Sequence, residues 1–230
     1  MEVVFVVGLR GKKNSTDDDY SSSKADDALF DEINRFQDIL QGDFVDSYDN
    51  LTLKTLLILK TMSEVEQCRR ARYLLKCDID VFINVPHLVA VIQYYSSLQR
   101  TILGFLTSNF AFRRGPYAVT IDEYPLDRYP PYAAGPLYVI SNDLPPELFE
   151  TSEYVPRFRM EDVYVTGILA IITGGVNLVN LPDLITVHYS EHPLTVCDVI
   201  ANRITARSEI TAVEKLSIWK EIEDNRTCVS

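Results

Sequence analysis

Apolar and polar positions along the chain follow two periods, one typical of β-strands and one typical of α-helices. Short apolar runs bounded by polar or proline-containing segments predict strands. These runs span residues 1–8, 73–76, 81–83, 102–106, 117–120, 137–141 and 185–189. The first of them predicts a buried strand at the start of the sequence.

Apolar residues three or four positions apart predict helices between the strands. One helix is expected to begin near Asp26 with Ser23 as its N-cap, after an exposed loop over residues 10–24. Its apolar stripe consists of Leu29, Ile33, Phe36 and Leu40. Further helices are predicted from about residue 51, after Pro86, over 162–172, and over 211–223 with Thr211 and Glu214 at capping-box spacing. This alternation indicates an α/β sheet.

The composition favours one globular domain. A chain of 230 residues with 47% hydrophobic content can bury one sizeable core. The formal net charge of -11 argues against a nucleic-acid backbone or an anionic membrane surface as the main partner. An anionic ligand would therefore need a cation or local basic groups at its site.

Cysteines, sequons and apolar runs bear on the compartment. Four cysteines (Cys68, Cys77, Cys197 and Cys228) are too few and too scattered for a disulfide scaffold, so their redox state stays open. Three N-glycosylation sequons, at Asn14, Asn50 and Asn225, favour a secretory compartment. Two uncharged runs, 81–98 and 163–181, are long enough to span a bilayer, but polar, proline and glycine residues interrupt them. Buried strands and helices are the better interpretation of these runs.

Asp78 and Asp80 stand one residue apart between two predicted strands. Ligands of open α/β sheets collect beyond the carboxyl ends of the strands. Paired carboxylates at such a place are hard oxygen ligands that can hold a divalent cation against a diphosphate. Because alternate strand residues share a face, we expect both side chains to point to the same side. Such pairs also arise by chance in an acidic chain, so the interpretation depends on its context.

Four motifs in the same order resemble the β-1,3-galactosyltransferase family. They lie at 38–48 with 50–55, at Lys76–Asn84, at 129–135 with 138–141, and at Glu161–Val165. The resemblance implies the GT-A-like α/β fold of nucleotide-diphospho-sugar transferases, with a mixed central sheet flanked by helices. The segment that precedes residues 3–7 in the family has no counterpart in this sequence, so we expect an N-terminally truncated chain whose first strand is missing.

The resemblance implies a hexosyltransferase that moves galactose or an N-acetylhexosamine from a UDP-sugar to a glycan in β-1,3 linkage. Asp80 is then the ligand of Mn²⁺, and Asp78 holds the nucleotide and completes the metal shell. Lys76 belongs to the same cofactor-binding motif. His188, at the end of a predicted strand, is a further candidate metal ligand.

The resemblance also implies an acceptor side. Asp162 is the candidate general base, with Glu161 orienting it or binding the acceptor, and a single base with direct displacement would invert the anomeric centre. Tyr132 and Gly135 are candidate acceptor residues. An alternative for the acidic pair is a helix N-terminus, where acids favour the macrodipole by roughly 0.3–1 kcal/mol without catalysis.

Departures from the family motif leave a second function open. Ile79 stands where the family has the middle one of three aspartates. Together with the missing front segment, it favours a non-catalytic relative that acts as a glycan-binding or structural Golgi protein. For the enzyme, the resemblance implies the lumenal face of the Golgi membrane, with an anchor that is not in this sequence. We expect a catalytic domain over 1–205 and a C-terminal helix and tail over 206–230.

Overall fold

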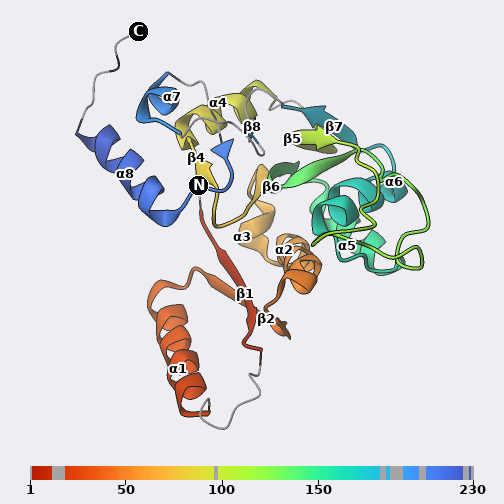
Figure 1. The fold of residues 1–230 in the computed structure, drawn as a ribbon, viewed down its shortest axis with the longest axis horizontal. Helices are drawn as coiled ribbons and strands as arrows, with labels where there is room; N and C mark the ends of the chain where they lie inside the picture. Colours follow the sequence, from red (N-terminus) through yellow and green to blue (C-terminus); the bar gives the residue numbers. More distant parts are fainter. Residues whose placement is uncertain are drawn as a thin grey trace.

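The protein is a mixed α/β structure, as the sequence predicts (Figure 1). The computed structural model describes residues 2–11, 19–95, 98–181, 185–186, 194–201, 206–224 and 228. A four-stranded sheet of order β3-β6-β5-β7 forms its centre. Its strands are β3 (Tyr73–Cys77), β5 (Thr101–Thr107), β6 (Tyr132–Ser141) and β7 (Asn177–Asn180). β6 pairs antiparallel with β3 and β5, while β5 pairs parallel with β7, so the sheet is mixed.

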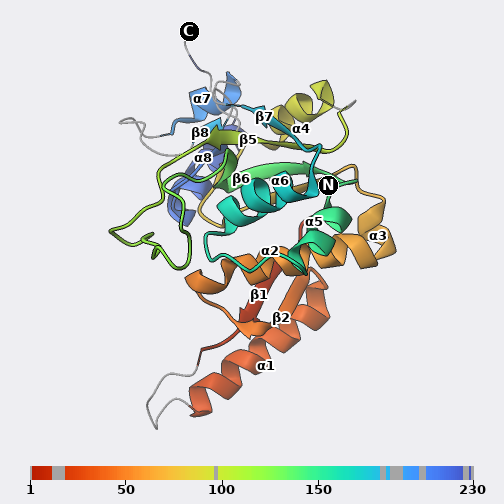
Figure 2. The same ribbon diagram turned by 90° about the vertical axis from the view of Figure 1, so that its right-hand side faces the viewer.

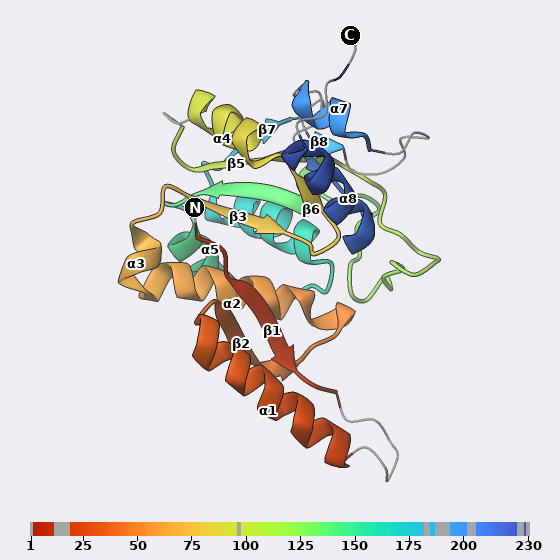
Figure 3. The ribbon, with the colours of Figure 1, turned by 90° about the vertical axis from the view of Figure 1, so that its left-hand side faces the viewer.

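Helices cover both faces of this sheet (Figures 2 and 3). On one side lie α2 (Leu51–Glu64), α5 (Pro145–Ser152) and α6 (Ala170–Thr173), and on the other lie α4 (Val85–Tyr94), α7 (Val196–Ile200) and α8 (Ala212–Glu223). The short α3 (Glu66–Arg69) joins α2 to β3. The larger buried cluster includes Leu59, Ile102, Tyr138, Leu148 and Tyr164, which come from both the sheet and its first helical layer. Apolar burial between sheet and helices is the main force that holds these layers together.

A second, two-stranded sheet extends the molecule beyond α2. β1 (Phe5–Leu9) and β2 (Ile39–Val45) pair in parallel, and α1 (Asp19–Phe36) connects them. The expectation of a buried first strand is wrong, because Phe5 and Leu9 are largely exposed. A two-stranded sheet offers no further strand to bury these side chains.

The first helix differs from its prediction at both ends. It already begins at Asp19, so Ser23 lies inside the helix and is not its N-cap, while residues 12–18 of the expected loop lie outside the described part of the chain. It stops at Phe36 because Gln37 adopts a positive φ of 54°. Leu40 therefore belongs to β2 and not to the helical stripe.

The segment between β5 and β6 is a long loop, and the predicted strand over 117–120 is wrong. Arg113 holds this loop together by donating hydrogen bonds to the carbonyl oxygens of Val119, Thr120, Tyr124 and Leu126. A buried group of aromatic side chains, Tyr124, Tyr129 and Phe158, packs beneath it. Side-chain donors replace the sheet ladder that the apolar pattern suggested.

The predicted helix over 162–172 is present in a wider form. Its first part, η2 (Val163–Leu169), is a π-helix, and α6 completes it. The helix ends at Gly174, whose φ of 75° is typical of a glycine that stops a helix. The remaining 3-10 turn, η1 (Tyr48–Asn50), leads into α2.

The C-terminal part forms a third sheet of order β4-β9-β8 with β4 (Phe82–Ile83), β8 (Ile185–Thr186) and β9 (Ala206–Arg207). α8 confirms the last predicted helix and carries the expected capping box between Thr211 and Glu214. A disulfide joins Cys197 to Cys228, whereas Cys68 and Cys77 are free. Within the described part of the chain, no helix is long and apolar enough to cross a membrane.

Candidate functional site

The two aspartates of the Asp78-Ile79-Asp80 segment lie in a turn that follows β3. Strand β3 ends at Cys77, the amide of Asp78 still donates to Pro136 O at 2.9 Å, and Val81 N closes the turn on Asp78 O at 3.3 Å. Ile79 is 90% exposed, and Asp80 is also exposed. The strand alternation from which we expected a shared face is therefore not the local geometry. A side chain at Ile79 that points into solvent leaves both flanking carboxylates in place.

Lys76 is the centre of the site. Its ammonium donates to Asp78 Oδ1 at 2.5 Å and to Gly135 O at 2.7 Å, and it lies 3.4 Å from Glu161 Oε2. The side chain is only 11% exposed. One buried cation thus links the end of β3, the middle of β6 and the start of the π-helix, which are far apart in the sequence.

Glu161 is buried and fully engaged. Its carboxylate accepts a hydrogen bond from the hydroxyl of Tyr138 and forms the ion pair with Lys76. The Tyr138 ring packs below the ammonium, with 5.7 Å between Lys76 Nζ and the ring centroid. Burial and the charge of Glu161 raise the pKa of Tyr138 well above its usual value, so its hydroxyl stays a donor. The contacts of Glu161 fit a residue that positions its neighbours.

Asp162 lies beside this network and is held by two backbone amides. Its Oδ2 accepts from Gly135 N at 2.9 Å and its Oδ1 accepts from Val163 N at 2.8 Å. A Cβ on residue 135 would lie 3.3 Å from Asp162 Oδ2, so glycine permits this close approach. Burial, followed by the charge of Glu161, raises the pKa of Asp162 to about 6. A carboxyl group with a pKa near neutrality is suited to general base catalysis.

Burial and neighbouring charges shift the pKa values of Lys76 and Asp78 in opposite directions. Burial alone would lower the pKa of Lys76, but the carboxylates of Glu161 and Asp78 outweigh burial and raise it, so the lysine stays charged. Burial raises the pKa of Asp78 although the nearby Lys76 ammonium lowers it. Burial also raises the pKa of the Cys77 thiol to about 11, so this side chain stays a neutral thiol at physiological pH.

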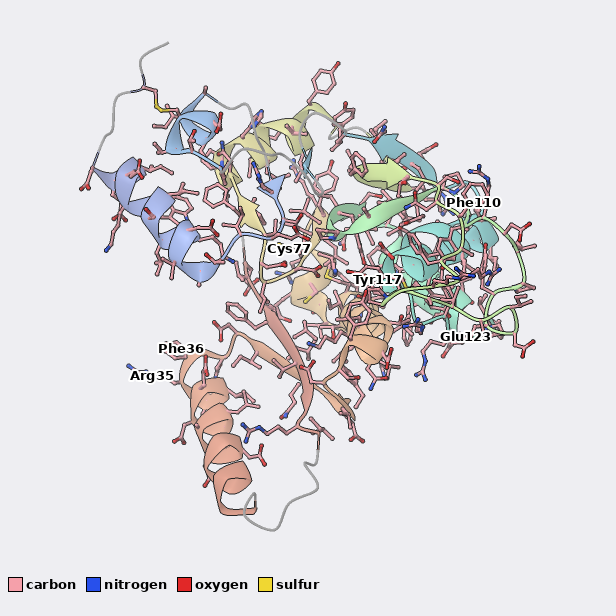
Figure 4. The ribbon with its side chains drawn as sticks, viewed as in Figure 1. Arg35, Phe36, Cys77, Phe110, Tyr117 and Glu123 are labelled. Carbon is pink, nitrogen blue, oxygen red and sulfur yellow. A yellow bond between two sulfur atoms is a disulfide. The ribbon has the colours of Figure 1, made fainter. Side chains whose placement is uncertain are left out.

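The candidate acceptor residues differ in exposure. Tyr132 is 5% exposed, and its hydroxyl accepts a hydrogen bond from Asn109 Nδ2 at 3.1 Å. Gly135 lies in the site itself, between Lys76 and Asp162. Two further tyrosines, which were not candidates from the sequence, are far more exposed to solvent than Tyr132. Tyr48 and Tyr117 are about half exposed, with ring centroids 6.0 Å apart, and Tyr117 is labelled in Figure 4 with Cys77 at the end of β3.

The sequence also provided no prediction of the role of Tyr138 as a hydrogen-bond donor. It is completely buried and serves as the donor to Glu161. In the antiparallel register of β3 and β6, Tyr138 is the partner of Lys76. The sequence signal was a lysine on one predicted strand and a tyrosine on another. That the two are cross-strand partners follows only from the strand register, which the structure gives.

The structure brings together Lys76, Asp78, Glu161, Asp162 and Gly135. Asp80 stands on the same turn as Asp78, and His188 lies outside the described residues. Over the ranges that the structure describes, no group of three or more His, Cys, Asp or Glu side chains is arranged to hold a metal ion. The turn thus offers two carboxylates, Asp78 and Asp80, which are of the hard oxygen type that divalent cations accept in proteins.

Comparison with known proteins identifies the relatives of this chain. A family model described as Galactosyltransferase matches residues 1–182, which include every one of these described site residues. The chain is 33% identical over 208 residues to "UDP-GalNAc:beta-1,3-N-acetylgalactosaminyltransferase 1" of Sus scrofa, covering 87% of this chain and 60% of that protein. It is 34% identical over 198 residues to "Beta-1,3-galactosyltransferase 5" of Homo sapiens, covering 85% and 62%. The chain thus spans about 60% of the length of the first of these relatives. The match over most of its length shows that the chain belongs to the galactosyltransferase family.

Proposed function

We propose that the chain carries the catalytic site of an inverting hexosyltransferase, which moves a hexose from a UDP-sugar to a glycan in β-1,3 linkage. The observation that carries the proposal is the cluster formed by Lys76, Asp78, Glu161 and Asp162, in which one carboxylate has a pKa near neutrality. The names of the relatives support N-acetylgalactosamine or galactose as the donor sugar.

The reaction needs a base for the acceptor hydroxyl and a stabiliser for the leaving diphosphate. Asp162 takes the proton while the acceptor oxygen forms a bond to the anomeric carbon. The bond from that carbon to the diphosphate oxygen breaks, and its electron pair leaves with the diphosphate. Gly135 N orients the Asp162 carboxylate, and Glu161 keeps the site negative enough to raise the basicity of Asp162.

The donor side would be formed by the turn after β3. Asp80 and Asp78 would hold Mn²⁺, with His188 as a further ligand, and Lys76 would keep Asp78 oriented. The bound ion would neutralise charge on the leaving diphosphate. Such a cation would also offset the repulsion between an anionic donor and a chain with a net charge of -11.

The proposal also states where the acceptor binds, where the enzyme resides and how the chain is divided. We place the acceptor glycan of a glycoprotein or glycolipid next to Gly135 and Asp162, with Tyr132 at the start of β6 on the same side. We place the enzyme at the lumenal face of the Golgi membrane, attached by an N-terminal anchor outside this sequence. Residues 1–205 would form the catalytic unit and 206–230 its C-terminal extension.

The test is UDP release from UDP-N-acetylgalactosamine and UDP-galactose with Mn²⁺, measured with and without a glycan acceptor. We expect acceptor-dependent release by the wild type. Asp162→Asn should lose at least about 100-fold in kcat, the usual contribution of a general base, and still bind UDP. Asp80→Ala should lose UDP binding as well. Equal rates for all three proteins would refute the proposal.

The rival function, a non-catalytic glycan-binding relative, predicts a different result. Glycan binding would then persist in Asp80→Ala and Asp162→Asn, with no UDP release by any of the proteins. The raised pKa of Asp162 favours the enzyme, because a general base needs a pKa near neutrality, whereas glycan binding does not.

A further inference from the structure

The turn that carries Asp78 and Asp80 is held from outside by the C-terminal segment of the chain. We call residues 206–223, which comprise β9 and α8, the C-terminal clasp. The clasp lies beyond residue 182, where the match to the family model ends. Its hydrogen bonds from Ile210 and Lys215 go to backbone carbonyl oxygens of the turn and not to the aspartate side chains.

Two hydrogen bonds join the clasp to the turn. Ile210 N donates to Asp80 O at 2.8 Å, and Lys215 Nζ donates to the carbonyl oxygen of Ile79. Directly after the turn, β4 pairs antiparallel with β9, with Phe82 opposite Arg207. Consecutive peptide groups of the turn are therefore fixed by one neighbouring element.

The clasp is itself firmly anchored. Phe82, Val199, Ile210 and Ile218 form a buried cluster of their own, and the Trp219 ring lies 5.9 Å from that of Phe82. The disulfide between Cys197 and Cys228 ties the segment after α8 back to α7. Figure 1 shows α8 running beside β4. An anchored support of this kind can position an exposed turn accurately.

Lys215 also places a positive charge where the turn needs one. The turn carries the carboxylates of Asp78, which is half-buried, and Asp80, which is exposed, and these two negative charges repel each other. The Lys215 ammonium lies at this turn, since it donates to the carbonyl oxygen of Ile79 between the two aspartates. An ammonium group with three donor hydrogens can bind the carbonyl and still attract an anion.

We propose that the C-terminal clasp is part of the donor site and that Lys215 is a positioning residue, which fixes the Asp78-Ile79-Asp80 turn for the diphosphate of the donor. This inference rests on the proposed transferase function. It adds to the donor site a segment that lies outside the part of the chain matched by the family model.

The experiment compares Lys215→Met with Lys215→Arg and with Lys220→Met in the full chain. Methionine keeps the apolar stem and removes the charge, arginine restores a cationic donor, and Lys220 is an exposed lysine of the same helix. UDP binding in the presence of MnCl₂ is measured by calorimetry, and KM for the donor and for the acceptor is measured in the transfer assay. We expect Lys215→Met to weaken UDP binding about tenfold and to raise donor KM alike, as for one lost charge-assisted hydrogen bond. Acceptor KM should stay unchanged.

Thermal unfolding separates positioning from mere stability. We expect the three variants to unfold within a few degrees of one another and Lys215→Arg to regain most of the UDP affinity. Wild-type affinity in Lys215→Met overturns the role of the clasp, as does a loss that Lys220→Met shares or that arginine fails to rescue. Absence of UDP binding by the wild type would refute the transferase itself, and the clasp proposal with it.

Discussion

At the scale of single residues, Asp162 decides how the site should respond to pH. Its carboxyl pKa is raised to about 6, first by burial and then by the charge of Glu161. A general base must be ionised to accept a proton, so its activity is present above its pKa and is lost as the pH falls through it. We predict that kcat/KM is level above pH 6 and falls about tenfold for each unit below it, as for a single protonation.

The Glu161→Gln variant tests the cause of that pKa. Removing the carboxylate charge takes away one of the two effects that raise the pKa of Asp162, while the amide oxygen can still accept from Tyr138. The break in the pH profile should then move to lower pH. A profile that breaks near pH 4 in the wild type, or that does not move in Glu161→Gln, would contradict the assignment of Asp162 as the base.

Lys76 gives a second prediction at this scale, concerning stability. Lys76 and Glu161 are 11% and 4% exposed, so the Lys76→Met change leaves a carboxylate buried without its cation. Breaking a buried ion pair from one side costs about 3–5 kcal/mol of unfolding free energy. Urea denaturation at pH 7 measures the loss.

The matched control for Lys76 is Lys54→Met. Lys54 pairs with Asp46 at 2.8 Å, but both side chains are partly open to solvent. Pairs of that kind contribute about 0–1 kcal/mol. Similar losses of unfolding free energy in the two variants would mean that the ion pair of Lys76 with Glu161 does not stabilise the site.

At the scale of elements, local signals were informative where a single interaction decides the structure. The capping box of Thr211 and Glu214 fixes the start of α8, and the glycine at 174 ends α6. The same reasoning failed where tertiary contacts decide. The apolar run over 117–120 gave no strand, because Arg113 and the packed tyrosines organise that loop instead.

The sequon at Asn50 shows the same limit. It predicts a glycan acceptor, yet Asn50 Nδ2 donates to Val45 O at 2.8 Å and the Thr52 hydroxyl is buried, donating to Phe158 O at 2.8 Å. In the folded protein Asn50 ties the start of α2 to the end of β2, and Thr52 ties it to the 158–159 segment. A sequence pattern cannot distinguish these two uses, because they need the same residue types.

The capping box also supplies the prediction at this scale. In Thr211→Ala the Glu214 amide loses its side-chain acceptor, and the first turn of α8 should fray. We expect a loss of about 1 kcal/mol in unfolding free energy, measured by urea denaturation. Ser217→Ala removes a hydroxyl from an exposed position inside the same helix and should change stability by less than about 0.5 kcal/mol. An equal effect of both changes would argue against the cap.

At the scale of the whole molecule, the site is assembled by contacts that no local pattern contains. The sequence motifs contain Lys76, Asp78, Glu161 and Asp162, and the structure joins the first three through one ammonium group and holds Asp162 beside them through Gly135 N. What could not be predicted is the register of β3 against β6, which puts Tyr138 opposite Lys76, and the support of the aspartate turn by α8. Both depend on packing between segments more than 60 residues apart along the chain, such as the 136 residues between Ile79 and Lys215.

The disulfide is a further feature of this scale that the scattered cysteines did not reveal. Cys197 and Cys228 are separated by 31 residues and enclose β9 and α8 in one covalent loop. Closing a loop of that length removes conformational entropy from the unfolded chain. In the chain-entropy treatment this stabilises the fold by about 3–4 kcal/mol.

Removal of that cross-link should therefore weaken the protein as a whole. We predict that Cys197→Ser combined with Cys228→Ser lowers the unfolding free energy by about 3–4 kcal/mol, and that dithiothreitol does the same to the wild type. Dithiothreitol should have no further effect on the double variant, because Cys68 and Cys77 are already free thiols. Cys68→Ser is the control and should leave both the stability and its response to dithiothreitol unchanged. If the wild type proves as stable in dithiothreitol as without it, the loop through α8 is not a stabilising constraint, because a bond that matters for folding must weaken the fold when it is broken.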